Sequence, residues 1–352
     1  MNKTVLLLAP TPPPYGGIAS WTIRMLNTHL ENGWTVDIVD EKLIGNRGVF
    51  SSKKKRFLSE LRRITKIWGS LFRKLKNKNI LVVHASIPAS NGSMFREIIS
   101  AIITRFRKRP FIIHYRCTLP NMVVSKFNFF LFKRLNKLST SAIVLNEVSK
   151  DFMIRHSKTK VSLIPNFTEV DVPGQAKPIN NDVNVISYVG GVTKEKGCES
   201  IIQTAPFFPN ITFILVGEIS HDISKKQIPK NVQLTGPLPK IQVQNIFQKT
   251  DIFLFPGNFV GEGFSNSLVE AMAFGIPCIV SNWAANADMI ENKGGFVISP
   301  NNVGEIVEAI NKLTDYNLRT EISKWNINKV KNNYSEKIIT TLYVQKYEEV
   351  RL

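Results

Sequence analysis

Short runs of apolar residues alternate with segments of helical periodicity along most of the 352-residue chain. Continuous apolar runs bounded by turn residues are typical of strands buried in a parallel sheet, whereas apolar residues spaced three and four apart are typical of amphipathic helices. Because helical segments separate most of the runs, the pattern predicts an α/β fold of βαβ units. The expected strands lie at residues 4–9, 34–39, 80–84, 110–115, 141–145, 161–164, 184–189, 211–216, 232–234, 252–255 and 279–280.

The alternation of strands and helices occurs in two series. Residues 168–183 between them are polar, contain Pro and Gly and show no periodicity, which indicates a linker. The chain is long for one hydrophobic core and sufficient for two domains. We therefore expect an N-terminal domain over residues 1–167, a C-terminal domain over 184–335 and a final helix within 336–352.

The loop at residues 257–266 contains the most informative chemistry. It follows the strand at 252–255 and precedes a helix expected over 268–274, so it falls where parallel sheets bind ligands. Gly261 and Gly263 allow a ligand to approach the backbone closely. The start of the following helix offers unpaired N–H groups, which favour an anion such as phosphate.

One carboxylate lies in this loop and a second lies just after it. Glu262 lies within it, and Glu270 lies in the first turns of the helix. A phosphate between two carboxylates would suit a nucleotide sugar, since one carboxylate can accept from ribose hydroxyls and the other from the sugar ring. The alternative is that Ser267 and Glu270 form a capping box, S-x-x-E, and that Glu262 is only solvated.

The string EGFSNSLVEAMAFGIP at residues 262–277 resembles the signature of the large family of retaining glycosyltransferases with the GT-B fold. The resemblance implies two Rossmann-like domains facing a central cleft, with the last helix packing back across the N-terminal, acceptor-side domain. It also implies that Glu270 binds the nucleotide ribose and that Glu262 contacts the donor sugar. The residues implied to hold sugar and diphosphate are Gly263, Phe264, Ser265 and Asn266.

Two further glycine turns extend the resemblance. Gly16 and Gly17 precede a helix expected over 18–31, where the family has a turn that faces the donor phosphates; a tight turn that needs positive φ is the alternative. Residues 190–197, GGVTKEKG, combine a glycine-rich backbone with lysines, which suits a diphosphate.

Lys196 and Gly197 match the K-G of the family pattern in that second loop, whereas Gly191 stands where the family has arginine. Lys194 is the candidate replacement for the missing cation. No D-x-D type metal site is evident, so we expect no metal or cofactor. Lys196, backbone amides and the helix start would then stabilise the leaving diphosphate.

His84 and His114 each lie near the carboxyl end of an expected strand. A histidine inside an apolar strand is usually a hydrogen-bonded core residue, yet both fall where a parallel sheet opens its ligand crevice. Family members often carry a cleft histidine near the donor sugar, and His114 fits that placement better than His84. The expected catalytic residues are therefore His114, Glu262 and Lys196.

Positive charge is concentrated in the first half of the chain. The net charge is +19, and residues 1–170 contain 29 Lys and Arg against 9 Asp and Glu. This asymmetry points to an anionic partner for the first domain. Segment 51–79 combines helical apolar spacing with a basic face, which is typical of a membrane-surface helix with Trp68 and Phe72 at the headgroups. The alternative is a core-packed helix with a solvated basic face.

Other features of the sequence indicate where in the cell the protein is expected. No apolar run approaches the roughly 20 residues of a membrane span, and the first residues lack a signal-type cleavage site. Cys117, Cys198 and Cys278 are odd in number and widely spaced, so we expect buried free thiols. Together with the basic segment, these features favour a cytoplasmic protein that is peripheral on the inner face of the cell membrane.

The resemblance implies transfer of a sugar from a nucleotide-diphosphate donor, with UDP favoured by family frequency, to a glycan or lipid-linked acceptor. A basic, membrane-associated first domain favours a role in bacterial surface polysaccharide assembly, such as O-antigen, capsule or lipopolysaccharide. One alternative is a nucleotide-sugar 2-epimerase on the same fold. The other is a non-catalytic basic binding protein, for example for RNA, but no RNA-binding motif is present and we expect no nucleic-acid partner.

Overall fold

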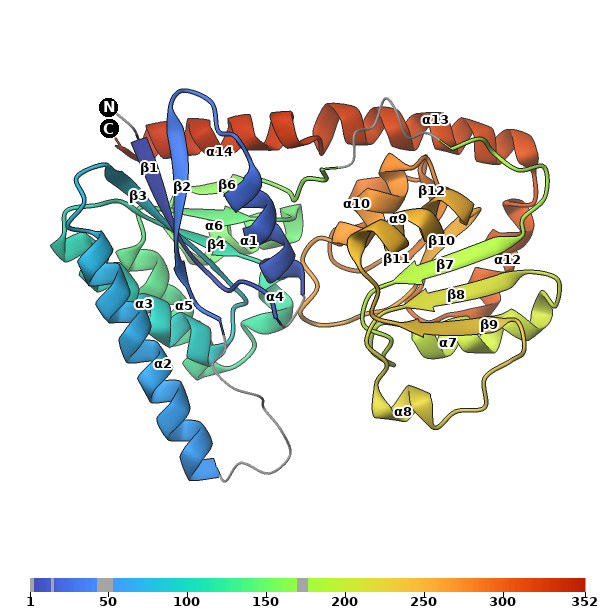
Figure 1. Cartoon of the computed structure of the whole chain (residues 1–352), viewed down its shortest axis with the longest axis horizontal. Helices are drawn as coiled ribbons and strands as arrows, with labels where there is room; N and C mark the ends of the chain where they lie inside the picture. The colour runs from blue at the N-terminus through green and yellow to red at the C-terminus, as the bar shows by residue number, and fades with distance from the viewer. Residues whose placement is uncertain (1–2, 14–15, 43–52, 170–176, 352) are drawn as a thin grey trace. The chain divides into compact units, whose positions relative to one another are not determined.

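The computed structural model describes residues 3–13, 16–42, 53–169 and 177–351. Contacts between residues divide the chain into two units (Figure 1). The first contains residues 1–166 and 337–352, and the second contains residues 167–336. Each unit holds one six-stranded parallel sheet, and we describe the units separately.

The sheet of the first unit has the strand order β2-β1-β3-β4-β5-β6. Its core strands are almost completely buried, as their continuous apolar sequences predict. The strands are β1 (Lys3–Ala9), β2 (Trp34–Asp40), β3 (Ile80–Ile87), β4 (Phe111–Tyr115), β5 (Ser141–Val144) and β6 (Val161–Leu163).

Helices pack on both faces of this first sheet. One hydrophobic cluster joins strand residues to α2 (Lys53–Lys74), α3 (Asn91–Phe106) and α5 (Lys126–Leu138). Strand side chains that point to the opposite face of the sheet make aromatic contacts with α1 (Gly17–Asn27) and α14 (Glu336–Arg351). Two further helices, α4 (Leu119–Met122) and α6 (Glu147–His156), complete the unit.

The sheet of the second unit has the order β12-β11-β10-β7-β8-β9. Its strands are β7 (Val185–Val189), β8 (Thr212–Val216), β9 (Val232–Gly236), β10 (Ile252–Phe255), β11 (Cys278–Ser281) and β12 (Gly295–Ile298). The helices are α7 (Cys198–Thr204), α8 (His221–Ser224), α9 (Lys240–Lys249), α10 (Asn266–Ala273), α11 (Asn286–Ile290), α12 (Val303–Lys312) and α13 (Tyr316–Asn333), with a 3₁₀ turn η1 (Ala205–Phe207). The expected fold class of two Rossmann-like units is confirmed.

Each sheet has one position where the chain reverses its direction of strand addition. In the first sheet this switch lies between β1 and β3, and in the second it lies between β7 and β10. Loops that leave adjacent strands at such a point diverge to opposite sides, which opens a crevice at the carboxyl ends of the strands. The topology therefore provides one potential ligand crevice in each unit.

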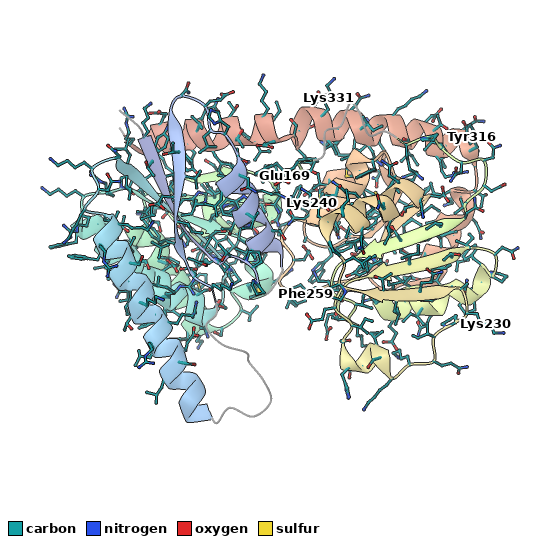
Figure 2. The ribbon with its side chains drawn as sticks, viewed as in Figure 1. Glu169, Lys230, Lys240, Phe259, Tyr316 and Lys331 are labelled. Carbon is teal, nitrogen blue, oxygen red and sulfur yellow. The ribbon has the colours of Figure 1, made fainter. Side chains whose placement is uncertain are left out.

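The segment expected as a linker, residues 168–183, belongs to the second unit and contacts it. The carboxylate of buried Asp251 accepts from the backbone amides of Asn184 and Val185 at 2.8 and 2.9 Å and from Asn180 Nδ2 at 2.8 Å. At the start of the segment, Glu169 pairs with Lys240 of α9 (Figure 2). Side-chain contacts thus fix the described parts of this segment to the unit.

Several element boundaries differ from expectation. The first helix ends at Asn27 instead of residue 31, because Thr28 adopts extended backbone. Strand β3 continues to Ile87, so His84 lies in its middle and not at its end. The three cysteines are buried and free, which confirms the prediction. None of the helices in the described part of the chain has the length and apolar composition needed to cross a membrane.

Both histidines of the first sheet are fully buried in a hydrogen-bonded chain. Arg116 Nη1 lies 3.3 Å from His114 Nε2, and because a guanidinium can only donate, that nitrogen accepts. His114 Nδ1 then carries the proton and donates to His84 Nε2 at 3.1 Å. His84 Nδ1 in turn donates to the hydroxyl of Tyr347, at 2.9 Å. The chain is complete only when both imidazoles are neutral.

This arrangement predicts that stability falls in acid. Burial, with a smaller contribution from Arg116, lowers the pKa of His84 to about 3, and the pKa of His114 is lowered well below its usual range for the same reasons. The pKa of each histidine is lower in the folded state than its unfolded value of about 6.5. The contribution of the neutral histidines to the free energy of unfolding is therefore complete above pH 6.5 and is lost as the pH falls towards 3. We expect the free energy of unfolding to fall by a few kcal/mol, as an order of magnitude, between pH 6.5 and pH 4, and thermal unfolding across this range measures it.

The variant His84→Gln should lower stability at neutral pH and flatten its decline between pH 6.5 and 4. An exposed histidine of the same unit supplies the control, since His29→Gln should change the pH profile much less than His84→Gln does. An identical slope in wild type and His84→Gln would show that the buried histidines do not titrate as described.

Candidate functional site

Two loops meet at the switch point of the second sheet. One follows β7 and contains residues 190–197, and the other follows β10 and contains residues 256–265. A Cβ added to Gly257 would lie 2.3 Å from the carbonyl carbon of Lys196, and one added to Gly197 would lie 2.7 Å from the amide nitrogen of Gly257. Asn258 N–H donates to the carbonyl of Glu195 at 3.0 Å. The two backbones are therefore in direct contact, which only glycine permits at these positions.

This backbone contact brings together two charged side chains that are 66 residues apart. Lys196 Nζ lies 2.5 Å from Glu262 Oε2, and the two side chains are 22% and 13% exposed. The ammonium also lies 4.4 Å from the ring centre of Phe259, whose place in the loop Figure 2 shows. The pair is positioned by its surroundings and still reaches solvent. A ligand in the crevice can thus contact both charges.

The first turn of α10 begins beside this pair. Ser265 caps the helix, and its hydroxyl accepts from the amide of Leu268 at 3.3 Å. The capping box proposed for Ser267 and Glu270 is therefore wrong, because the helix starts at Asn266 and the cap lies two residues earlier. Glu270 is half-buried one turn into the helix, where its carboxylate is not needed to cap the helix.

Two other loop residues support the structure. Gly263 is buried, and Phe264 packs edge-on against Tyr334 with ring centres 5.3 Å apart. The Phe264 ring is thus directed into the unit, so its backbone is the part suited to a ligand. Asn266 is the first residue of α10 and lies at the helix start that would face an anion.

Lys194 lies outside this arrangement. Its side chain is 72% exposed, and Nζ lies 3.7 Å from Glu199, which Lys226 also contacts at 2.5 Å. The structure therefore pairs Lys194 with a different carboxylate from the one that holds Lys196. Its expected role as a replacement for the missing arginine stays a prediction.

The glycine turn of the first unit, Gly16 and Gly17, is not a turn with positive φ. Gly16 is extended, with φ of −174°, and Gly17 is the first residue of α1. The alternative of a positive-φ turn is therefore wrong. Both residues line a cavity of about 500 Å³ within the first unit.

His114 is not exposed in a crevice. Trp21 packs against its ring with centres 5.4 Å apart, and both ring nitrogens have partners within the first unit. His84 lies in the same cluster. The observed burial favours the core alternative for both, and the contact with a donor sugar implied for His114 stays a prediction.

Comparison with known proteins identifies the second unit. Residues 174–329 match the family model for glycosyl transferases group 1. The second unit belongs to this family. The match includes the 190–197 loop, the Lys196–Glu262 pair and α10, so the whole arrangement described above lies within the matched residues.

Two curated relatives are similar over much of the chain. The capsular polysaccharide biosynthesis glycosyltransferase CapM of Staphylococcus aureus is 26% identical over 307 residues, which cover 77% of this chain and 80% of CapM. The UDP-Gal:alpha-D-GlcNAc-diphosphoundecaprenol alpha-1,3-galactosyltransferase of Escherichia coli is 25% identical over 226 residues, which cover 56% of this chain and 57% of that enzyme.

Solved structures support the fold. Anabaena HepE in complex with UDP superposes with a TM-score of 0.75 over 99% of this chain and 100% of HepE, at 16% sequence identity. At that level of identity the similarity concerns the fold alone. It assigns the two Rossmann-like units to the GT-B class.

Sequence reasoning did not find the residues that hold the 256–259 loop of this glycosyltransferase. Ser281 Oγ donates to the carbonyl of Gly257 at 2.5 Å, and Trp283 Nε1 donates to the carbonyl of Phe259 at 2.8 Å. Ser281 is the last residue of β11 and Trp283 lies two residues beyond it, and β11 neighbours β10 in the sheet. Their position at the carboxyl end of the adjacent strand was the available signal. Across the described ranges, no cluster of three or more His, Cys, Asp or Glu has an arrangement suited to a metal ion.

The contact between the loops predicts a specific sensitivity to substitution. Gly257→Ala places a methyl group within 2.6 Å of three backbone atoms of Lys196, so the loops must separate. We expect a loss of about 1–3 kcal/mol in thermal or urea unfolding. The control is Gly69→Ala in exposed α2, where a Cβ meets nothing within 4 Å. That change should stabilise the protein by about 0.5–1 kcal/mol, and equal effects of the two variants would contradict the packing described.

Proposed function

We propose that this group 1 glycosyltransferase transfers a sugar from a UDP-sugar to a glycan or lipid-linked acceptor, with retention of anomeric configuration, in bacterial surface polysaccharide synthesis. The observation that carries the proposal is the Lys196–Glu262 pair at the switch point, beside the start of α10. The names of CapM and of the Escherichia coli galactosyltransferase support the pathway and the donor class. HepE, which was solved with UDP, supports the nucleotide.

The site offers complementary contacts to each part of such a donor. The Lys196 ammonium and the amides at the start of α10 suit the diphosphate, because both present positive charge to the crevice. The Glu262 carboxylate suits sugar hydroxyls, and Glu270 suits the two vicinal hydroxyls of ribose. In the absence of donor, Glu262 neutralises Lys196, so the pair is already oriented for a ligand that contains a phosphate next to a sugar.

The same groups explain how the chemistry would proceed. Cleavage of the anomeric bond leaves negative charge on the diphosphate and positive charge on the sugar. A cation and helix amides held in place before the reaction stabilise the departing phosphate without reorganisation. Glu262 would stabilise the developing positive charge on the sugar ring. The acceptor hydroxyl then attacks from the face that the phosphate leaves, with the phosphate taking its proton.

Lys196 and Lys194 provide a matched pair to test this proposal. Lys196→Ala removes the cation that pairs with Glu262 and should lower UDP release from UDP-glucose, UDP-galactose or UDP-N-acetylglucosamine by about 10²–10³ in kcat. Lys194→Ala, which affects an exposed cation of the same loop, should change the rate less than threefold. Equal effects on turnover would mean that Lys196 has no special role.

Glu270→Ala is the companion variant for donor binding. Loss of a charged acceptor for the ribose hydroxyls should weaken UDP binding by roughly 1.5–3 kcal/mol, measured by isothermal titration calorimetry. The exposed Glu321→Ala on α13 is its control. If wild type fails to bind UDP, or if the product sugar has inverted configuration by NMR, the proposed function is wrong.

We also propose that the first unit binds an anionic membrane surface, where a lipid-linked acceptor would be found. Helices α2, α3 and α5 lie side by side (Figure 1). They expose large apolar side chains, which are Leu58, Leu61, Phe72, Phe95, Ile102, Phe106, Phe127 and Phe130. Exposed basic residues lie among them, which are Arg62, Lys66, Arg73, Arg105, Lys126, Lys133, Arg134 and Lys137. We call this set the basic aromatic face.

The structure corrects which aromatic residues would contact lipid. Trp68 packs against the core and its Nε1 donates to the carbonyl of Arg96 at 3.3 Å, so it is not a headgroup anchor. Phe72 is exposed and lies under the guanidinium of Arg107, 4.0 Å away. The side chains of Lys53, Lys54, Lys55 and Arg56, which the sequence places in the basic segment, lie outside the described residues.

Vesicle co-sedimentation tests the basic aromatic face. Phe106→Ser with Phe127→Ser should reduce binding to vesicles of phosphatidylglycerol and phosphatidylcholine at least tenfold, because both rings are well exposed and sit among basic residues that each contribute roughly 1 kcal/mol near an anionic surface. Wild-type binding should also decline with salt and vanish on phosphatidylcholine alone.

The control for that experiment is Phe207→Ser, which removes an equally exposed aromatic residue, 64% exposed, from the second unit. It should leave vesicle binding unchanged. Binding that ignores lipid charge, or an equal loss in the control, would exclude the basic aromatic face as the membrane surface.

A further inference from the structure

A small pocket lies at the amino end of the first sheet, away from the carboxyl ends where parallel sheets usually bind ligands. Its walls come from the end of α3 with the turn into β4, and from the end of α5 with the turn into β5. Its volume of about 160 Å³ is below the about 300–1,000 Å³ of sites for drug-sized ligands, so it has room for one small group. We call it the basic pocket and define it by the lining residues Arg105, Arg109, Phe111, Lys137, Ser139 and Thr140.

The two turns that form the pocket are fixed to each other by hydrogen bonds. Phe111 N–H donates to the hydroxyl oxygen of Thr140 at 3.1 Å, and Thr140 N–H donates to the carbonyl of Phe111 at 2.8 Å. The hydroxyl of Ser139 donates to the carbonyl of Leu135 at 2.9 Å. Because the Thr140 oxygen accepts in its pair, the hydroxyl proton remains available to donate. The pocket is therefore held in shape without a ligand.

The three cations of the pocket have no acidic partner within the part of the chain that the structure describes. They are Arg105, Arg109 and Lys137, and the Nε atom of Arg109 is buried without a hydrogen bond. The buried Arg63 and Arg96 of the same unit differ, since each pairs with a carboxylate. Native proteins usually satisfy a buried donor of a charged group, because leaving it unsatisfied is costly. The pocket thus has the donors for an anion and no carboxylate that competes for them.

The alternative is that these cations only stabilise helix ends. Arg105 and Lys137 lie in the last turns of α3 and α5, where a cation interacts favourably with the helix dipole. Each helix end has roughly half a negative charge, so the two ends offset about one of the three positive charges. Arg109 lies beyond the end of α3, and the carbonyl of Thr104 already accepts from its amide. An excess of about two positive charges therefore remains in the pocket.

We propose that the basic pocket binds a phosphate group. Each of the two guanidinium groups can offer paired N–H donors to phosphate oxygens, and the ammonium of Lys137 adds a point charge. A phosphate monoester has up to two negative charges and three acceptor oxygens, which match the excess charge and the donors. A carboxylate has one charge and two oxygens, so the pocket should prefer phosphate to acetate.

Free phosphate and the headgroup of an anionic lipid both contain the group that the pocket recognises. Arg105 and Lys137 belong to the pocket and also to the basic aromatic face, and the neighbouring Phe106 is 74% exposed. The pocket therefore borders that face, where the phosphate of a bound lipid would be found. Binding of phosphate does not rest on sugar transfer, since the pocket lies outside the residues 174–329 that match the family model.

Two charge-matched double variants test the pocket. Arg105→Gln with Lys137→Gln removes two of its cations, whereas Lys133→Gln with Arg134→Gln removes the same charge from exposed positions of α5 that do not line it. All four positions are exposed, so both variants should keep the thermal unfolding midpoint of wild type within a few degrees. The single variant Arg109→Gln, at a half-buried position, provides an independent check.

The first experiment is an NMR titration of the full chain with sodium phosphate at constant ionic strength. The amide signals of Phe111, Ser139 and Thr140 should shift with millimolar affinity, and acetate should bind about tenfold more weakly. The pocket double variant and Arg109→Gln should each weaken phosphate binding about tenfold, whereas the control should stay within about twofold of wild type. Phosphate at the start of α10 is recognised separately, because it shifts amide signals of the second unit.

The second experiment identifies the source of the phosphate. Vesicles of phosphatidylcholine contain either phosphatidylglycerol or the same charge as oleate, which has no phosphate. If the pocket takes a headgroup, wild type should prefer phosphatidylglycerol about threefold or more, and the pocket double variant should lose this preference. The control should bind both kinds of vesicle more weakly and keep the preference. Phosphate binding without any lipid preference assigns the pocket to free phosphate.

Three results would overturn the phosphate site. They are no binding of phosphate in either form, acetate binding as tight as that of phosphate, and an equal loss in the pocket and control double variants. None of them affects the proposed sugar transfer, because UDP release does not involve the pocket. Conversely, a wild type that releases no UDP would overturn the proposed function and leave the phosphate titration unchanged.

Discussion

The contact between the backbones of Lys196 and Gly257 is the constraint on which the donor site depends. Strands β7 and β10 are hydrogen-bonded neighbours, so the loops that follow them leave the sheet about 4.8 Å apart. Glycine at 197 and 257 lets these loops touch, and this contact gives Lys196 its direction towards Glu262. The position of α10 follows, because its cap at Ser265 is only three residues beyond Glu262.

The strand pattern was predictable because buried parallel strands are continuous apolar runs, and such runs need no tertiary information. The pairing of Lys196 with Glu262 was not, since it depends on β7 lying beside β10 in the sheet. Ser265 and Ser267 both precede a helical pattern, and only the backbone shows which one caps. Trp68 follows the helical spacing of its segment, but the spacing does not say which neighbours cover it. In the sequence, Glu41 is an acidic residue that follows a strand, and nothing distinguishes it. Only the structure shows that Arg96 and Glu97 lie next to it.

The two sheets use the same switch-point geometry for different chemistry. In the second unit the crevice holds a partly exposed ion pair beside a helix start, which suits a charged diphosphate. In the first unit the cavity holds arginines paired with carboxylates, and burial raises the pKa of the Glu41 carboxyl among them. A switch point in both sheets therefore does not imply that both bind the same kind of ligand.

The positive charge of the first half of the chain is divided between buried arginines and cations on the surface. Arg63 and Arg96 are directed inward and face carboxylates, so they contribute no net charge to the cavity. Many of the exposed cations of the first half lie on α2, α3 and α5, which also expose aromatic rings. A lipid-linked glycan has an anionic diphosphate next to the membrane and neutral sugars beyond it. The exposed cations on the helices of the first unit are suited to the anionic part of such a molecule.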